Sequence, residues 1–373
     1  MGSYEDHTPM DERKRIRDEL LASEYYPFVV ALPKVELHLH IEGTLVPELR
    51  WEFAQRNGLT LKSPRTGQVY RDLEHLRSEV ETFSFFEAYY DGFDVLHTTQ
   101  DYYDLAMNYF RRASAMNVRY VEVFFDPQGH TRRGVGWDTF MTGFQQASER
   151  AEKELNVKSK WIMCILRDMS PESAMEHYEA ALNYRDMIVG LGLDSESYKL
   201  PPSLFENVWS RARADGFFKL TAHCDDGAKE DVHDHIREAC CSMGGTGADR
   251  IDHGINTADV PELIELVKSR NLGLTLCPCA YLRHQPAEPM YAKIRLLYDQ
   301  GVKIMIGSDD PAYMDDNWQV NNMLLVQSRC GFSDHDMVKL AKNAVDMSWA
   351  PEPVKEAIVE EIDSVFQNRT TKL

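Results

Sequence analysis

The chain lacks long apolar runs, and no segment approaches the roughly 18 consecutive apolar residues that a transmembrane helix needs. It is also poor in positive charge, because 41 Lys and Arg residues stand against 60 Asp and Glu residues and leave a formal net charge of −19. Such a charge repels phosphate backbones and anionic lipid. The composition therefore disfavours nucleic acid and membranes as partners, and it is compatible with a homo-oligomer.

Signals for export are absent as well. Residues 1–27 form a charged N-terminal extension without an apolar core segment, and the seven cysteines are an odd number spread over a long chain. Neither a signal peptide nor a disulfide framework is indicated, so we expect a reducing, cytoplasmic location. The final residues, Thr371-Lys372-Leu373, differ by one residue from the Ser-Lys-Leu peroxisomal signal, which makes peroxisomal import a secondary expectation.

Short apolar runs rich in β-forming residues recur along the chain, and each is followed by a longer segment with helical spacing. Eight such runs occupy residues 34–40, 119–125, 160–166, 188–193, 218–223, 250–253, 272–277 and 303–308. Strands that alternate with helices form parallel sheets, and eight of them predict a closed (β/α)8 TIM barrel of the α/β class. We expect residues 28–373 to form this barrel as a single domain.

One segment breaks the even spacing. Residues 44–117 are too long for one crossover and carry helical patterns, for example Tyr102, Leu105 and Tyr109. We therefore expect inserted helices after the first strand. A last helix is expected from about Pro353 to Phe366, with Ile358 and Ile362 on its apolar stripe.

Histidines and carboxylates close several of the predicted strands. His38 and His40 are two positions apart, so both imidazoles point to the same face of a strand. His223, His253 and Asp309 end or follow the fifth, sixth and eighth runs. Because the carboxyl ends of barrel strands meet at one face, these side chains should converge there. Three His and one Asp suit zinc with an open position for water, which predicts metal-assisted hydrolysis.

Four motifs then carry a resemblance to a known family, and they occupy residues 38–49, 117–128, 250–256 and 308–313 (HLHIEGTLVPEL, NVRYVEVFFDPQ, RIDHGIN and SDDPAY). From about Phe28 to Phe366 the chain resembles the adenosine/adenine deaminase branch of the amidohydrolases, and within it the adenine deaminases of microbes and fungi. The resemblance implies a barrel and hydrolytic loss of ammonia from a 6-aminopurine.

The resemblance also implies roles for single residues. One zinc per subunit would be held by His38, His40, His223 and Asp309. A single ion also agrees with Asp194 at the end of the fourth run, where related barrels with two metals carry a bridging lysine. His253 would orient or deprotonate the attacking water, while Asp310 would bond a purine ring nitrogen.

The sequence departs from the family directly after His223. Adenine deaminases read His-Ala-Gly-Glu-Glu-Gly there, and this chain reads His-Cys-Asp-Asp-Gly. Counted without a gap, Asp226 replaces the Glu that delivers a proton to the ring; with one residue deleted, Asp225 and Asp226 replace the Glu pair. In either case the carboxyl is one methylene shorter, and a shift of roughly 1 Å can cost about a hundredfold in rate.

Two pocket loops differ as well. Residues 195–201 read SESYKLP where the family has Ser-Ser-Glu-x-Gly-His-Pro, and residues 277–281 read CPCAY where it has Cys-Pro-Leu-Ser-Asn. Ser195 and Tyr281 are therefore candidate substrate contacts. The leading hypothesis is a zinc-dependent deaminase of adenine or a closely related 6-aminopurine. The alternatives are a zinc amidohydrolase of another substrate, such as an N6-substituted adenine, another amino-heterocycle or an amide, and a weakly active zinc-binding paralogue.

Overall fold

The computed structural model describes residues 7–195, 200–224 and 231–371. Asp225 and Asp226, and the final residues Lys372 and Leu373, lie outside these ranges, as do residues 1–6 of the expected N-terminal extension. Eight strands are present: β1 Lys34–Glu36, β2 Val118–Phe125, β3 Lys158–Leu166, β4 Ile188–Asp194, β5 Lys219–Cys224, β6 Arg250–His253, β7 Gly273–Leu276 and β8 Lys303–Ile306. Each falls on one of the predicted runs.

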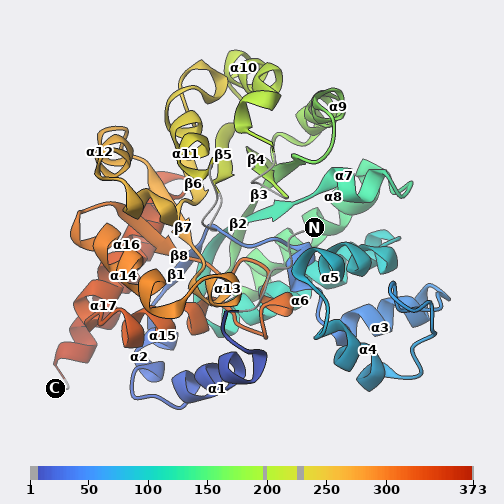
Figure 1. Cartoon of the computed structure of the whole chain (residues 1–373), viewed down its shortest axis with the longest axis horizontal. Helices are drawn as coiled ribbons and strands as arrows, with labels where there is room; N and C mark the ends of the chain where they lie inside the picture. Colours follow the sequence, from blue (N-terminus) through green and yellow to red (C-terminus); the bar gives the residue numbers. More distant parts are fainter. Residues whose placement is uncertain (1–6, 196–199, 225–230, 372–373) are drawn as a thin grey trace.

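The strands pair in sequence order from β1 to β8, and every pairing is parallel. Figure 1 shows the strands at the centre of the molecule with helices around them. A parallel sheet needs a crossover between each pair of strands, and the connecting helices supply it. The predicted (β/α)8 TIM barrel is confirmed.

The barrel is closed between the ends of β8 and β1. Asp309 N–H donates to His38 O over 3.0 Å, and His40 N–H donates to Asp309 O over 3.1 Å. A Cβ atom on Gly307 would lie 2.8 Å from both the Cβ and the carbonyl oxygen of His38, so only glycine permits this approach. The first strand was expected over residues 34–40, but β1 ends at Glu36, and Leu39 and His40 join the sheet only through isolated bridges.

Helices surround the strands and pack against them (Figure 1). The outer helices are α6 Thr99–Ala115, α7 Pro127–Thr131, α8 Trp137–Leu155, α9 Pro171–Ala181, α10 Glu206–Asp215, α11 Val232–Cys241, α12 Pro261–Ser269, α13 Pro278–His284, α14 Ala287–Asp299, α15 Gln319–Arg329, α16 Asp334–Met347 and α17 Glu352–Thr370. Packing against the sheet is tight, as where Phe144 of α8 stacks on Trp161 of β3 with ring centroids 4.1 Å apart. The expected last helix corresponds to α17, whose Ile358 and Ile362 are buried.

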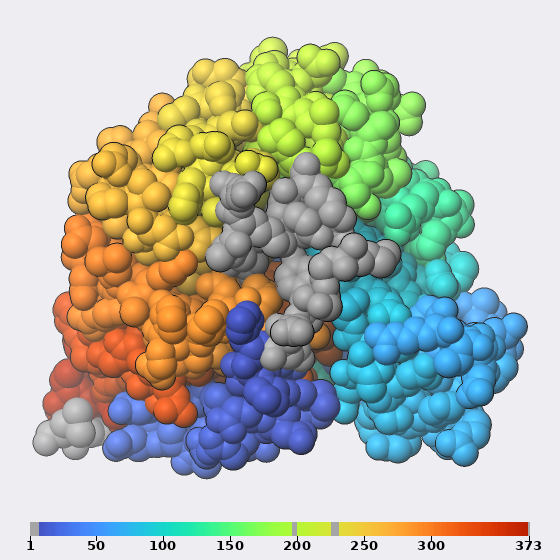
Figure 2. All heavy atoms as spheres, in the orientation of Figure 1, coloured from blue at the N-terminus to red at the C-terminus, as the bar shows by residue number. Residues whose placement is uncertain are grey.

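Helices are inserted after the first strand, as predicted. They are α3 Pro47–Arg56, α4 Leu73–Val80 and α5 Phe85–Gly92, followed by α6. In Figure 2 residues of α3 to α5 form the blue lobe on one side of the face shown. A buried carboxylate, Asp101, fixes the start of α6, because it accepts from the backbone N–H groups of His97 and Thr98 at 3.0 and 2.7 Å.

Two helices precede β1, namely α1 Met10–Leu21 and α2 Tyr26–Ala31. Ile16 and Leu20 of α1 are buried in the main hydrophobic core, and Arg13 Nε lies 2.5 Å from Asp315 Oδ2. The described part of the charged N-terminal segment is therefore packed on the barrel. Among the helices of the described ranges, none has the length and apolar character needed to cross a bilayer.

Candidate active site

The four predicted metal ligands come together at the carboxyl ends of β1, β5 and β8. His38 Nε2 lies 3.3 Å from Asp309 Oδ1, and His40 Nε2 lies 3.0 Å from His223 Nε2 and 3.7 Å from Asp309 Oδ1. All four side chains are at least nine-tenths buried. The strands that carry them are far apart in sequence, and barrel closure brings them to one point.

The separations suit a bound metal ion: His38, His40 and His223 form one group of possible ligands, and Asp309 belongs with His38 to a second, overlapping group. Zinc binds imidazole nitrogen and carboxylate oxygen at about 2.0–2.2 Å, so neighbouring ligand atoms around it should lie about 3.3 Å apart. The three separations of 3.0, 3.3 and 3.7 Å lie close to this value. His38 Nε2 is buried and has no hydrogen-bond partner among the described residues. A buried polar atom without a partner is costly, and a metal ion would satisfy it.

Hydrogen bonds fix which nitrogen of two imidazoles carries the proton. His38 Nδ1 faces the Thr275 carbonyl oxygen at 3.2 Å, and His223 Nδ1 faces the Leu193 carbonyl oxygen at 3.0 Å. A carbonyl oxygen only accepts, so both Nδ1 atoms must be N–H donors. Each Nε2 atom therefore presents its lone pair to the centre, as a metal ligand must.

Burial also keeps the imidazoles neutral. Burial, then the neighbouring His253 and His40, holds the pKa of His38 well below its ordinary value of 6.5. Burial lowers the pKa of His40 to about 4, and burial together with His38 and His40 lowers that of His223 well below its ordinary value of 6.5. Only the neutral ring offers a lone pair, so the three side chains are ready to bind a cation at neutral pH.

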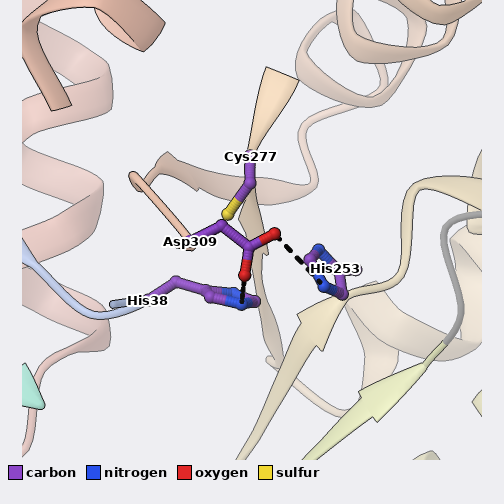
Figure 3. Close-up of side chains that lie close together, drawn as sticks. All are labelled: His38, His253, Cys277 and Asp309. Atoms are coloured by element: carbon purple, nitrogen blue, oxygen red, sulfur yellow. Dashed lines mark ion pairs between the residues drawn. The ribbon is translucent and has the colours of Figure 1, made fainter. Parts of the chain in front are cut away.

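His253 ends β6 and borders the same centre. Its Nε2 lies 4.0 Å from Asp309 Oδ2, and its ring centroid lies 4.4 Å from that of His38. Figure 3 shows the Asp309 carboxylate between the two imidazoles, with Cys277 Sγ directed to the same point. Burial, then the charge of Asp309, raises the pKa of the Cys277 thiol well above its ordinary value.

The backbone is strained where two of these side chains are presented. His253 has φ +56° and Asp309 has φ +64°, both in the left-handed region that non-glycine residues seldom adopt. Such residues persist only where the surrounding structure holds them, and they concentrate at functional sites. His253 ends β6, and Asp309 lies three residues after the end of β8, so both strained positions are at the carboxyl ends of strands.

Asp310, expected to bind the purine ring, is buried beside the metal set. Burial, followed by the charge of Asp309, raises its pKa well above the ordinary value of 3.8, and in the part of the chain that the structure describes its Oδ1 has no hydrogen-bond partner. A carboxyl group in this state keeps its proton and can donate it to an acceptor atom. Gly43 allows the approach of this residue, because a Cβ there would lie 2.6 Å from Asp310 Cα.

The other predicted site residues are Tyr281, Ser195 and the pair Asp225 and Asp226, and only the first two lie among the described residues. The Tyr281 hydroxyl lies 3.0 Å from His253 Nδ1, so this side chain touches the site through a histidine. The Ser195 hydroxyl lies 2.8 Å from the hydroxyl of Tyr90, on the inserted helix α5. Asp225 and Asp226 lie outside the described residues, so their part stays a prediction.

Sequence reasoning missed the residues that support the ligands. The Thr275 hydroxyl lies 2.7 Å from His38 Nδ1 and donates to Asp252 Oδ1 over 3.1 Å. Asp252 Oδ2 accepts from Thr221 over 2.6 Å. A second group faces the other side of His40, whose Nδ1 lies 3.5 Å from Asp194 Oδ2. Three of these residues lie within strands (Thr221, Asp252 and Thr275), and Asp194 ends one. The sequence signal that could have indicated them is the alternation of side chains along a strand, which gives the residues that face the barrel interior.

A (β/α)8 barrel with three histidines and an aspartate converging at the carboxyl ends of its strands defines a metal-dependent hydrolase of the amidohydrolase type. Comparison with known families makes the assignment specific: the family described as "Adenosine deaminase" matches residues 33–365. The chain belongs to the adenosine deaminase family and is a hydrolytic deaminase.

Three known proteins illustrate the similarity. An adenine deaminase from Rhodospirillum rubrum is 40% identical over 333 residues, which cover 88% of this chain and 95% of that protein. The crystal structure of adenine deaminase from Arthrobacter aurescens matches with a TM-score of 0.82 at 33% identity, covering 90% of this chain and 99% of that one. An amidohydrolase from Burkholderia ambifaria, solved with bound zinc, matches with a TM-score of 0.81 at 25% identity, covering 94% and 96%.

Proposed function

We propose that the protein is a zinc-dependent deaminase that hydrolyses adenine, or a closely related 6-aminopurine, to the 6-oxopurine and ammonia. The observation that carries the proposal is the convergence of His38, His40, His223 and Asp309, with three pairs of their ligand atoms 3.0, 3.3 and 3.7 Å apart. Relatives named adenine deaminase cover almost the whole chain and support adenine as the substrate. The zinc-bound amidohydrolase from Burkholderia ambifaria supports the choice of metal.

The ligand set would hold zinc through Nε2 of the three histidines and an Asp309 carboxylate oxygen. When bound, zinc lowers the pKa of water toward neutrality and so supplies a nucleophile. His38 and His223 are held for this role by hydrogen bonds at Nδ1. Burial of all four groups excludes competing solvent and strengthens their attraction for a cation.

The protein's own groups then orient the reactants. His253 borders the metal set on the side of Asp309 Oδ2, where it can bond the attacking oxygen. Asp310 carries a buried carboxyl with a raised pKa and one unpartnered oxygen, which suits a hydrogen bond to a ring nitrogen of the purine. The acid that protonates the ring as water adds is assigned to Asp225 or Asp226, on the family motif alone.

The test is an ammonia-release and ultraviolet assay of the zinc-loaded protein with adenine, adenosine, N6-methyladenine and N6-isopentenyladenine. We expect fast turnover of adenine, and loss of that turnover in His223→Ala because the ligand set is then incomplete. Tyr178→Phe is a matched control, since this buried tyrosine bonds Asp215 on the outside of the barrel. Turnover confined to an N6-substituted base would transfer the assignment to that substrate, and silence on all four would refute purine deamination.

A further inference from the structure

One contact at the candidate site belongs to neither the metal set nor the purine-binding groups. Tyr281, on the short helix α13 after β7, places its hydroxyl 3.0 Å from His253 Nδ1. The two rings meet edge to face, with centroids 5.5 Å apart and planes at 62°. Tyr281 is fully buried and His253 is 9% exposed, so water does not compete for this bond.

The opposite nitrogen of the same ring faces the reaction centre. His253 Nε2 lies 4.0 Å from Asp309 Oδ2. The side chain starts from a strained backbone with φ +56° and packs against the His38 ring. Tyr281 therefore holds one edge of an imidazole whose other edge points at a metal ligand.

The neighbours at the two edges prefer the same tautomer. A neutral imidazole has one N–H donor and one lone pair, and a hydrogen bond at one nitrogen decides which is which. A phenol O–H is a good donor to an imidazole lone pair, whereas a carboxylate oxygen only accepts. The phenol at Nδ1 and the Asp309 carboxylate beyond Nε2 both favour the proton on Nε2.

We infer that Tyr281 is a positioning residue: it donates to His253 Nδ1, fixes the ring and places the N–H on Nε2. This step rests on the proposed deaminase function. His253 then donates a hydrogen bond from Nε2 that orients the attacking oxygen, and His253 is not the group that first accepts the proton of the attacking water. Tyr281 thus acts through His253, whereas the sequence analysis gave it as a candidate substrate contact.

Kinetics separates these two roles. Tyr281→Phe keeps the ring and removes the hydroxyl, and loss of a partner that orients a catalytic or metal-binding histidine typically costs about 10–100-fold. We expect kcat on adenine to fall by about this factor while KM stays within about a factor of two, because only an interaction in the transition state is lost. Tyr178→Phe, which removes a buried hydroxyl bonded to Asp215, should leave both constants unchanged. A raised KM with an unchanged kcat would instead make Tyr281 a substrate contact and overturn the inference.

A second readout needs no substrate. In zinc-loaded protein labelled with 15N-histidine, with His253→Gln used to assign the signals, we expect His253 Nδ1 to be pyridine-type and Nε2 pyrrole-type. In Tyr281→Phe both signals should move toward a tautomer mixture. A pyrrole-type Nδ1 in the unmodified protein would overturn the inference even if the variant did not fold. The spectrum is recorded without substrate, so it tests the role of Tyr281 independently of activity. If the expected tautomer were observed but the protein did not deaminate adenine, the proposed function would be refuted and the role of Tyr281 would stand.

Discussion

Thr275→Val tests how the structure prepares His38 for a metal. The Thr275 hydroxyl accepts from His38 Nδ1 at 2.7 Å and donates to Asp252 Oδ1 at 3.1 Å, so it links a candidate ligand to a buried carboxylate. Valine has almost the same shape and makes neither bond. The His38 N–H keeps only the longer contact to the Thr275 carbonyl oxygen at 3.2 Å.

The expected magnitude follows from what is lost. Removing a hydrogen-bond partner of a ligating histidine costs about 10–100-fold in metal affinity. Because one of the two acceptors at Nδ1 remains, we expect the lower end, an increase of about tenfold in the Kd for zinc, or about 1.4 kcal/mol. Leaving the Asp252 oxygen without its donor should also reduce the free energy of unfolding by about 1–3 kcal/mol.

Chelator competition with the folded metal-free protein measures the Kd, and urea unfolding measures the stability. The matched control is Thr221→Val, which removes the other hydroxyl on Asp252, at 2.6 Å, and has no bond to His38. It should lose similar stability with little change in zinc affinity. Equal loss of affinity in both variants, or a Kd within about twofold of the parent for Thr275→Val, would refute the link through His38.

Three further predictions address pH, space and buried charge. Burial lowers the pKa of His40 to about 4, so between pH 4 and 6.5 the imidazole is protonated in the unfolded chain but not in the folded one. The free energy of unfolding of the metal-free protein should therefore rise with pH across this window. By urea unfolding, the rise should exceed that of His40→Asn by up to about 3 kcal/mol. Gly43→Ala should push Asp310, lowering kcat/KM for adenine by at least about tenfold at unchanged zinc content. Arg250→Met should lower the free energy of unfolding by about 3–5 kcal/mol, because it leaves the Glu122 carboxylate, 2.6 Å from the guanidinium, buried without its cation.

Each of these has a contrary result. Parallel stability curves for His40→Asn and the parent would show that this imidazole titrates normally. Full activity in Gly43→Ala would show that Asp310 does not need its present position. For Arg250→Met, an unchanged unfolding midpoint would mean that Glu122 is protonated or finds another donor.

Much of the fold could be read from the sequence because parallel strands are buried on both faces and therefore appear as continuous apolar runs. Each of the eight runs became a strand, and the long segment after the first one became α3 to α6. The error at the end of the first strand has a physical cause. His38 and His40 turn toward the metal set and bond to Asp309, so the regular pairing with β2 ends at Glu36.

The convergence of the site was equally predictable, since the carboxyl ends of barrel strands meet at one face whatever their distance in sequence. The supporting contacts were not. Thr275 reaches His38 only because β7 and β8 have a particular register, and Tyr281 reaches His253 only through the direction of α13. Alternation along a strand gives the direction of a side chain, but the partner that it reaches depends on the packing of several elements at once.

We propose that one zinc ion on His38, His40, His223 and Asp309 supports the deamination of adenine by this chain. The most direct measurement is a zinc titration of the metal-free protein in which adenine deamination is followed at each addition. The account predicts that activity rises in proportion to added zinc and levels off at one equivalent per chain. Deamination by the metal-free protein, a break at two equivalents, or no turnover of adenine at any zinc level would contradict it.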